Sequence, residues 1–261
     1  MTISRGETVL RGWISVANMP KTNSLSITLA PALMPLLSQV LLRIRCLFDI
    51  NCNPSEIYEK LKIMNKLSLD IFILGMRLPG CIDPFEISVR AILGQQVTVK
   101  AARTLAMRLA VVFGDKVETP FEELSVTFPG PNTIYKLKAP IENHLGPLGI
   151  TGARARSIYA LAEALVTGSI SFSPSADPLK EMDKLRRIPG LGPWTVQYIG
   201  MRAFGWPDAF PHTDHGVKTV FSGIKPQDIL NLSQAWKPWR SYATLNLWNA
   251  LKERGVNERN P

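Results

Sequence analysis

The sequence is poor in the residues that build disulfides and metal sites. Its 261 residues include three cysteines and three histidines. The cysteines form no Cys-X-X-Cys pair, and three of them cannot all pair within one chain. The sequence therefore offers neither a disulfide framework nor a four-cysteine zinc or iron–sulfur site. This usage fits a reducing compartment, and we expect a cytoplasmic protein.

Long apolar runs are also lacking. The opening residues MTISRGETVLRGW contain no apolar signal-peptide core, and no later run is long enough to span a bilayer. We therefore expect a soluble protein with no membrane partner. A hydrophobic content of 46% and a charged content of 20% are those of a globular protein, and the length allows one large domain or two smaller ones.

Acidic residues are outnumbered by basic ones. The sequence has 30 Lys and Arg against 21 Asp and Glu, a net charge of +9. This excess suits a polyanionic partner, either nucleic acid or an anionic membrane surface, because neutralising phosphates releases counterions. Basic proteins without such a partner are common, so the charge alone does not decide between these classes.

β-Branched residues are concentrated at the start of the chain. VLRGWISVAN and SLSITLA show partial alternation and are joined by MPKTNS, which is typical of a turn, so the pattern predicts a β-hairpin. From Pro31 the apolar spacing becomes helical. In the Asn-Pro-Ser sequence that follows, Ser55 is expected to be the N-cap of a helix.

After the Pro/Gly-rich joint RLPGCIDP, apolar spacing predicts an almost wholly helical body. FEISVRAILGQQVTVKAARTLAMRLAVVFG predicts two helices that end at Gly114, whereas 115–140 is expected to be a loop. Further helices are predicted at about 154–167 and 178–187, across WTVQYIGMRAFG, and from about 214. The predicted fold class is mainly α, with a small α+β N-terminal domain.

The stretch LRRIPGLGPWTVQYIG carries the most specific signal. A dinucleotide-binding loop needs a preceding buried strand and a third glycine, and a Walker loop needs GKS or GKT; none of these is present. The pattern instead predicts two helices joined by a turn, with Gly190 and Gly192 at positions of positive φ or close approach and a helix starting near Pro193. Such a helix start binds phosphate without reading bases. A plain turn that binds nothing is the alternative, which Arg186 and Arg187 disfavour.

Four segments resemble the helix–hairpin–helix DNA glycosylase superfamily, and most closely its bacterial inducible DNA-3-methyladenine glycosylase II, the AlkA type. They are LRRIPGLGPWTVQYI, RLPGCIDPFEISVRAILGQQVTVKAA, PHTDHGVK and WKPWRSYATLNLW, and the resemblance extends from about residue 10 to 252. It implies an α/β domain at 1–52, shorter than is usual in the family, and a central helical domain at 84–206 that carries the hairpin. A second helical domain would combine 53–83 with 207–261, and the active-site cleft would lie between the two helical domains.

The resemblance implies a monofunctional DNA glycosylase of base excision repair that acts as a monomer. Its partner would be double-stranded DNA containing alkylated bases such as 3-methyladenine or 7-methylguanine, and hypoxanthine is a further candidate substrate. Lyase-active relatives carry a lysine just after the hairpin glycines, where this sequence has Trp194, so no Schiff base can form there. Two alternatives remain: a non-catalytic DNA-binding or damage-sensing protein, and a lyase-active oxidised-base glycosylase, which Trp194 disfavours.

By the same resemblance, Asp214 is the required aspartate, twenty positions after Trp194. It is expected to stabilise the oxocarbenium-like sugar or to position the attacking water. The sequence around it also fits a simple helix N-cap, and the two roles are compatible. Trp194, Tyr198 and Trp248 would line the base pocket, with His215 beside the aspartate, although aromatic residues on amphipathic helices more often belong to the core.

The hairpin is expected to bind the DNA backbone, and no cofactor is required for the chemistry. The DNA-backbone residues implied by the resemblance are Pro189, Gly190, Leu191, Gly192 and Thr195. A structural monovalent cation, Na⁺ or K⁺, would be held by the backbone carbonyls of Arg186, Ile188 and Leu191.

A flipped base leaves a gap in the duplex that a side chain usually fills. The family uses a leucine after the Gly-Gln of ILGQQV, and this sequence has Gln96 there. Glutamine fills such a gap with less apolar contact but can hydrogen-bond to the orphaned partner base. Lys218, Arg240 and Arg90 are further candidates for backbone-binding or structural cations, whereas the loop residue Asp208 matches no motif position.

Overall fold

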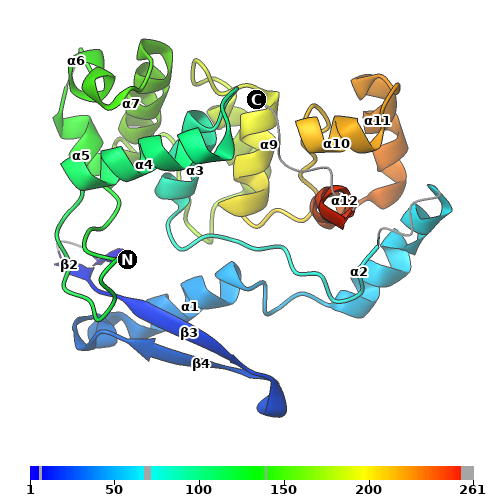
Figure 1. Ribbon diagram of the computed structural model, residues 1–261, viewed down its shortest axis with the longest axis horizontal. Helices are drawn as coiled ribbons and strands as arrows, with labels where there is room; N and C mark the ends of the chain where they lie inside the picture. Colours follow the sequence, from blue (N-terminus) through cyan, green and yellow to red (C-terminus); the bar gives the residue numbers. More distant parts are fainter. Residues whose placement is uncertain (6–7, 68–71, 139, 254–261) are drawn as a thin grey trace.

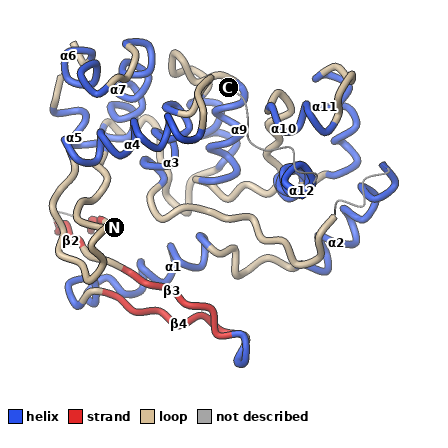
Figure 2. The backbone as a smooth tube through the Cα atoms, viewed as in Figure 1, coloured by secondary structure: helices blue, strands red, loops and turns tan. Residues whose placement is uncertain are grey.

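The computed structural model describes residues 1–261 except 6–7, 68–71, 139 and 254–261. The end of the predicted second helical domain, 254–261, therefore lies outside the described residues. Helices dominate the chain, and the strands are confined to its N-terminal part (Figure 2). The predicted class, mainly α with a small strand-containing N-terminal region, is confirmed.

The N-terminal strands form two antiparallel pairs. They are β1 (Thr2–Arg5) with β2 (Thr8–Arg11), and β3 (Ile14–Met19) with β4 (Ser24–Leu29). The predicted hairpin is β3–β4, which projects from one side of the molecule (Figure 1). The run predicted as its first strand is divided at Gly12, where a Cβ atom would lie 2.9 Å from both Ala30 Cβ and Leu33 Cγ. Close packing against the next segment therefore ends β2 there.

Two helices connect the strands to the helical body. A 3₁₀ turn (Pro31–Leu36) leads into α1 (Leu37–Leu47), and α2 (Pro54–Leu61) continues into a second 3₁₀ segment (Lys62–Leu67). The prediction that Ser55 caps α2 is wrong. Asn53 is the N-cap, and its side chain accepts from Glu56 N–H at 3.4 Å. Pro54 takes the first helical position because its ring fixes φ and it has no N–H to leave unpaired.

The central body is helical as predicted, and the second of its first two helices ends at Gly114. Its helices are α3 (Pro84–Leu93), α4 (Val99–Phe113), α5 (Pro131–Lys136), α6 (Glu142–Leu145), α7 (Gly152–Val166), α8 (Pro178–Leu185) and α9 (Pro193–Arg202). The predicted loop 115–140 is wrong at its end, because Gly130 and Pro131 start the short α5. The Pro/Gly content that suggested a loop there is partly a helix start.

The C-terminal part returns alongside α2. It comprises α10 (His215–Val220), α11 (Pro226–Leu232), a 3₁₀ turn (Ser233–Trp236) and α12 (Arg240–Glu253). In Figure 1 the C-terminal helices α10, α11 and α12 lie on the same side of the molecule as α2, and the loop that leads into α3 crosses the molecule from that side. None of the helices in the described part of the chain combines the length and the apolar character that a membrane crossing requires.

Three separate hydrophobic cores stabilise these parts. One joins the first strands to α1 through Ile3, Leu33 and Val40. A second lies within the body that runs from α3 to α9. The third packs α2 against the C-terminal helices, including Leu61 and Leu247. The domain ranges stay a prediction, and these cores give a division of this kind a physical basis.

Candidate active site and DNA interface

A cleft of ≈ 1700 Å³ lies where α9, α10 and α12 approach the turn between α3 and α4. Most of the site residues that the sequence predicts line it. They are Gln96, Gly190, Gly192, Trp194, Thr195, Tyr198, Asp214, His215, Lys218 and Trp248. Residues more than 150 positions apart in the sequence thus share one cavity.

Asp214 is the N-cap of α10, and its carboxylate accepts three hydrogen bonds. Oδ1 accepts from Val217 N–H at 3.1 Å and from Trp248 Nε1–H at 2.8 Å, and Oδ2 accepts from Trp194 Nε1–H at 2.8 Å. Hydrogen bonds to a charged acceptor are stronger and shorter than neutral ones. The carboxylate is therefore fixed in orientation by one helix and two indoles, and it is half-buried at the cleft.

Gly216 makes the approach of Trp248 sterically feasible. A Cβ atom at this position would lie 2.9 Å from Trp248 Cδ1 and 3.1 Å from Asp214 Oδ1. α10 packs against α12 at this point. The sequence analysis did not identify Gly216. Its position in the first turn of a helix, where glycine is unfavourable, was the sequence feature that could have indicated a close contact.

Tyr198 extends the aromatic wall of the cleft. Its ring stacks on Trp194, with centroids 5.3 Å apart and planes at 20°, and lies 6.5 Å from the Trp248 ring. On its other edge, Arg202 Nη1 donates to the Tyr198 hydroxyl at 3.3 Å. Arg202, which the sequence analysis missed, thus holds Tyr198 in place from behind the cleft.

The Cys81 thiol lies near this arginine, and burial raises the pKa of the thiol to about 12.

The hairpin between α8 and α9 is shaped by Gly190. Its φ is +87°, and a Cβ atom there would lie 2.1 Å from Ser157 Oγ, which donates to the Pro189 carbonyl at 2.8 Å. Gly192 is different from the prediction: it has φ −70° and no neighbour within 4 Å of an added Cβ. Gly192 is the N-cap of α9 and leaves open space in front of the helix start.

The other hairpin positions differ in their access to solvent. Pro189 is exposed, whereas Ile188, Leu191 and Thr195 are buried. Thr195 is only 2% exposed, and its hydroxyl accepts from Gln95 Nε2 at 2.9 Å. Backbone groups at this helix start, rather than the Thr195 hydroxyl, are therefore available to a ligand.

The turn between α3 and α4 is tied to the hairpin. Gln95 Nε2 donates to the Gly190 carbonyl at 2.9 Å, and Arg154 donates to the Gln95 carbonyl. The next residue, Gln96, is exposed and has a φ of +52°, a conformation that non-glycine residues rarely adopt. The chain thus presents the Gln96 side chain at the rim of the cleft, whereas its neighbour fixes the turn.

The remaining predicted charges have different roles. Arg240 makes two hydrogen bonds of 2.7 Å to Asp208, with both side chains 15% exposed, so it is a structural cation. Arg90 pairs with Glu86 on its own helix. Lys218 and His215 are exposed on α10 at the cleft.

Comparison with known proteins extends over most of the chain. Residues 2–83 match the AlkA N-terminal domain, and residues 89–235 match the HhH-GPD superfamily base excision DNA repair protein. DNA-3-methyladenine glycosylase 2 of Escherichia coli K12 is 34% identical over 238 residues, which are 91% of this chain and 81% of that protein. The probable bifunctional transcriptional activator/DNA repair enzyme AlkA of Mycobacterium tuberculosis CDC 1551 is 36% identical over 84% of this chain and 44% of its own length.

Solved structures show the same fold at lower identity. MBOgg1 in complex with a low affinity DNA ligand has a TM-score of 0.75 at 22% identity, covering 97% of this chain and 85% of that one. The 3-methyladenine DNA-glycosylase from Archaeoglobus fulgidus has a TM-score of 0.65 at 20% identity, covering 98% and 90%. These likenesses show the fold, and the sequence matches show the family. The chain belongs to the HhH-GPD superfamily of base excision DNA repair proteins.

Proposed function

We propose that this protein is a monofunctional DNA glycosylase that flips alkylated bases out of double-stranded DNA and hydrolyses their N-glycosidic bond. The observation that carries the proposal is the Asp214 carboxylate, held in an aromatic cleft by the indole N–H groups of Trp194 and Trp248. The relatives named as DNA-3-methyladenine glycosylases support the substrate class. A protein that only binds DNA has no need of a carboxylate oriented in this way.

The reaction breaks the bond between the sugar C1′ and a base nitrogen, and the base leaves with the bonding electron pair. Positive charge develops on the sugar, and a nearby carboxylate stabilises it electrostatically. Water then adds its oxygen to C1′ and loses a proton, which leaves an abasic site. Because Asp214 is already hydrogen-bonded in one orientation, little reorganisation is needed as the charge develops.

The aromatic wall suits an electron-poor base. Alkylated purines such as 3-methyladenine carry positive charge and are good leaving groups, so the site must recognise them more than activate them. The faces of Trp194, Tyr198 and Trp248 attract such a cation by stacking and cation–π interaction, worth about 0.5–2 kcal/mol per contact. His215 lies beside Asp214 at the rim, where it can contact the flipped nucleotide.

The hairpin and Gln96 supply the grip on DNA in this proposal. The open space before Gly192 lets a phosphate approach the N-terminus of α9, whose free amides attract anions. Gln96 would fill the gap left by the flipped base. All of these residues come from one chain, which supports action as a monomer.

A structural cation at the hairpin is also part of the proposal. The Leu191 N–H donates to the Ile188 carbonyl at 3.1 Å, so the two residues lie in one tight turn with Arg186 just before it. Backbone carbonyls are hard oxygen donors of the kind that Na⁺ or K⁺ accepts. Replacing these ions by tetramethylammonium at constant ionic strength should weaken DNA binding; equal affinity would contradict the cation.

One assay tests the function. Duplex DNA bearing 3-methyladenine or hypoxanthine is incubated with the protein, and abasic sites are scored before and after alkali. We expect base release, with strand breaks only after alkali. Breaks without alkali would indicate a lyase and contradict the monofunctional assignment, and binding without base release would favour the non-catalytic alternative.

A further inference from the structure

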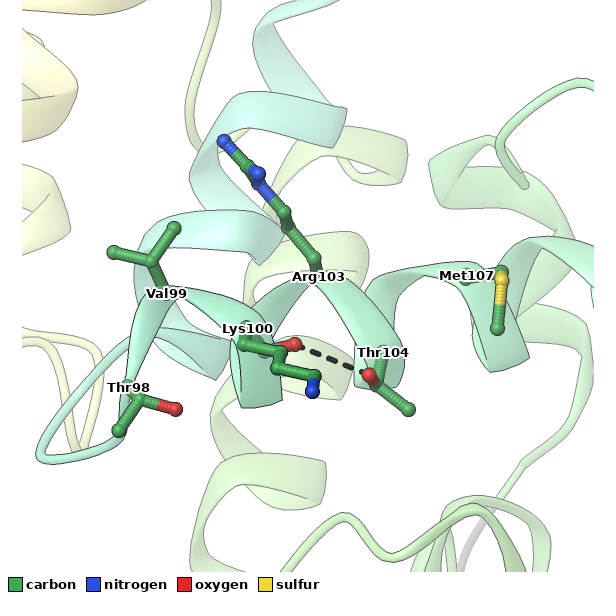
Figure 3. Close-up of a pocket in the computed structure, with 6 residues that line it drawn as sticks. All are labelled: Thr98, Val99, Lys100, Arg103, Thr104 and Met107. Carbon is green, nitrogen blue, oxygen red and sulfur yellow. Dashed lines mark hydrogen bonds between the residues drawn. The ribbon is translucent and has the colours of Figure 1, made fainter.

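A second depression lies on α4, next to the cleft. It has a volume of ≈ 590 Å³ and is lined by six residues of the first turns of α4 and its cap: Thr98, Val99, Lys100, Arg103, Thr104 and Met107 (Figure 3). The opposite face of α4 is buried in the central core through Leu105, Ala106 and Leu109. The depression therefore belongs to a solvent-facing side of one firmly packed helix.

This side of α4 is positively charged. The sequence contains no acidic residue between Glu86 and Asp115, whereas four basic residues fall in that stretch: Arg90, Lys100, Arg103 and Arg108. Arg90 is paired with Glu86, and Arg108 donates to the Leu148 carbonyl at 3.0 Å.

Lys100 and Arg103 are the two basic residues of the stretch whose side chains make neither an ion pair nor a hydrogen bond in the described part of the chain, whereas Arg90 and Arg108 each have a partner. Both are exposed, and they lie three residues apart on one face of the helix. In Figure 3 the two side chains extend from the helix in different directions, so they can contact two separate phosphates of an anionic partner.

The charged side is continuous with the cleft. Thr98 and Val99 line both cavities. Gln96, at the rim of the cleft, directly precedes this end of α4, and Gln95 is bonded to Gly190 of the hairpin. The order across the surface is thus hairpin, Gln96 turn, and then Lys100 and Arg103.

We propose that this side of α4 binds the phosphate backbone of the DNA strand opposite the lesion. The inference rests on the proposed function: the hairpin grips the strand that carries the lesion, and Gln96 enters the base stack. The complementary strand then lies across Gln96 from the hairpin, where Lys100 and Arg103 face its phosphates. Val99 and Met107, both exposed, flank these two residues along the same helix and can contact the sugars.

The test compares two double variants that lose the same charge. Lys100→Ala/Arg103→Ala removes the proposed contacts, and Lys21→Ala/Lys60→Ala removes two exposed lysines from the N-terminal hairpin tip and α2. Two lost phosphate contacts reduce the slope of log K against log salt by about 1.8. Between 50 and 200 mM salt, wild-type affinity should therefore fall about tenfold more than that of the α4 variant. The control should keep the wild-type slope, and an unchanged slope in the α4 variant would overturn the proposal.

Methylphosphonate linkages identify the strand, because they remove the charge of chosen phosphates. Placed opposite the lesion, they should weaken wild-type binding and leave the α4 variant unaffected. Placed in the lesion strand, they should weaken both proteins equally. If instead methylphosphonates in the lesion strand weaken wild-type binding but leave the variant unaffected, α4 binds the lesion strand and the assignment is wrong.

Failure of the α4 proposal can be distinguished from failure of the proposed glycosylase function. Single-turnover excision at saturating enzyme should be equal in the α4 variant and the wild type, because the variant changes no residue of the cleft chemistry. If the wild type releases no base, the proposed function fails while the binding comparison can still be read. If the α4 variant binds DNA like the wild type, the charged side serves another partner, such as an acidic protein, and the proposal fails alone.

Discussion

Asp214→Asn is the substitution whose consequences the structure defines most closely. Asparagine caps helices as well as aspartate does, so its Oδ1 can keep the Val217 N–H bond and the bond from Trp248. The amide NH₂ then takes the place of Oδ2 and faces the Trp194 Nε1–H, a donor opposite a donor. An unsatisfied donor costs about 1–3 kcal/mol, and the lower end applies here because the cleft is open to water.

The loss of rate is expected to be larger than the loss of stability. A carboxylate about 4 Å from a developing unit charge, at an effective dielectric constant of about 20, contributes about 4 kcal/mol. Removing its charge should therefore slow base release about 10³-fold. The melting temperature should fall by only about 2–4 °C, and the protein stays folded.

The assay measures single-turnover excision of hypoxanthine with enzyme in excess, beside binding to a duplex that contains an uncleavable abasic analogue. Asp228→Asn is the matched control, because Asp228 is an exposed carboxylate in the first turn of the neighbouring helix α11. Binding by the Asp214 variant should stay close to that of the wild type. If the folded variant retains more than a tenth of the wild-type rate, the electrostatic role of Asp214 is refuted.

Further substitutions test the hairpin, the ion pair and the buried thiol. At Gly190, φ is +87° and an added Cβ would lie 2.1 Å from Ser157 Oγ, so Gly190→Ala should lose DNA binding and about 1–3 kcal/mol of stability. An added Cβ at Gly192 would meet nothing within 4 Å, so Gly192→Ala should fold normally. Equal melting temperatures of the two variants would contradict this. Arg240→Ala leaves the largely buried Asp208 carboxylate unpaired and should cost about 3 kcal/mol in urea unfolding, against at most about 1 kcal/mol for the exposed pair lost in Arg186→Ala. The Cys81 pKa, raised from 9.0 to about 12, makes its contribution to stability complete below pH 9 and lost as the pH rises toward 12. The free energy of unfolding at pH 8–11 should therefore depend less steeply on pH in Cys81→Ala than in the wild type. An identical slope would show that the Cys81 thiol does not contribute to this pH dependence.

Local patterns predicted much of the fold because the responsible residues are adjacent in the sequence. Proline, glycine and helical spacing predicted three of these features: the PGLGP turn, the start of α9 at Pro193 and the end of α4 at Gly114. The misses are cases in which neighbours compete or distant residues decide. Asn53 and Ser55 are both good caps, and the proline between them selects the first.

Tertiary contacts account for the features that the sequence could not reveal. Gly12 interrupts a run of strand-forming residues because Ala30 and Leu33 pack against it. At the site, the motif positions indicated Asp214 and the aromatic residues, but not that indoles from α9 and α12 would donate to opposite oxygens of one carboxylate. Such an arrangement depends on how two helices pack, which no local spacing encodes.

The geometry of Asp214 also unites two roles that the sequence leaves as alternatives. A helix cap needs one carboxylate oxygen to face the helix amides, and Oδ1 does so. That bond fixes the plane of the carboxylate, so Oδ2 is directed toward Trp194 at the cleft. Trp194 in turn both stacks on Tyr198 and donates to the carboxylate. A lysine in its place would lose the stacked ring as well as the indole donor. The hydrolytic character of the site therefore depends on the tryptophan that is present as much as on the amine that is absent.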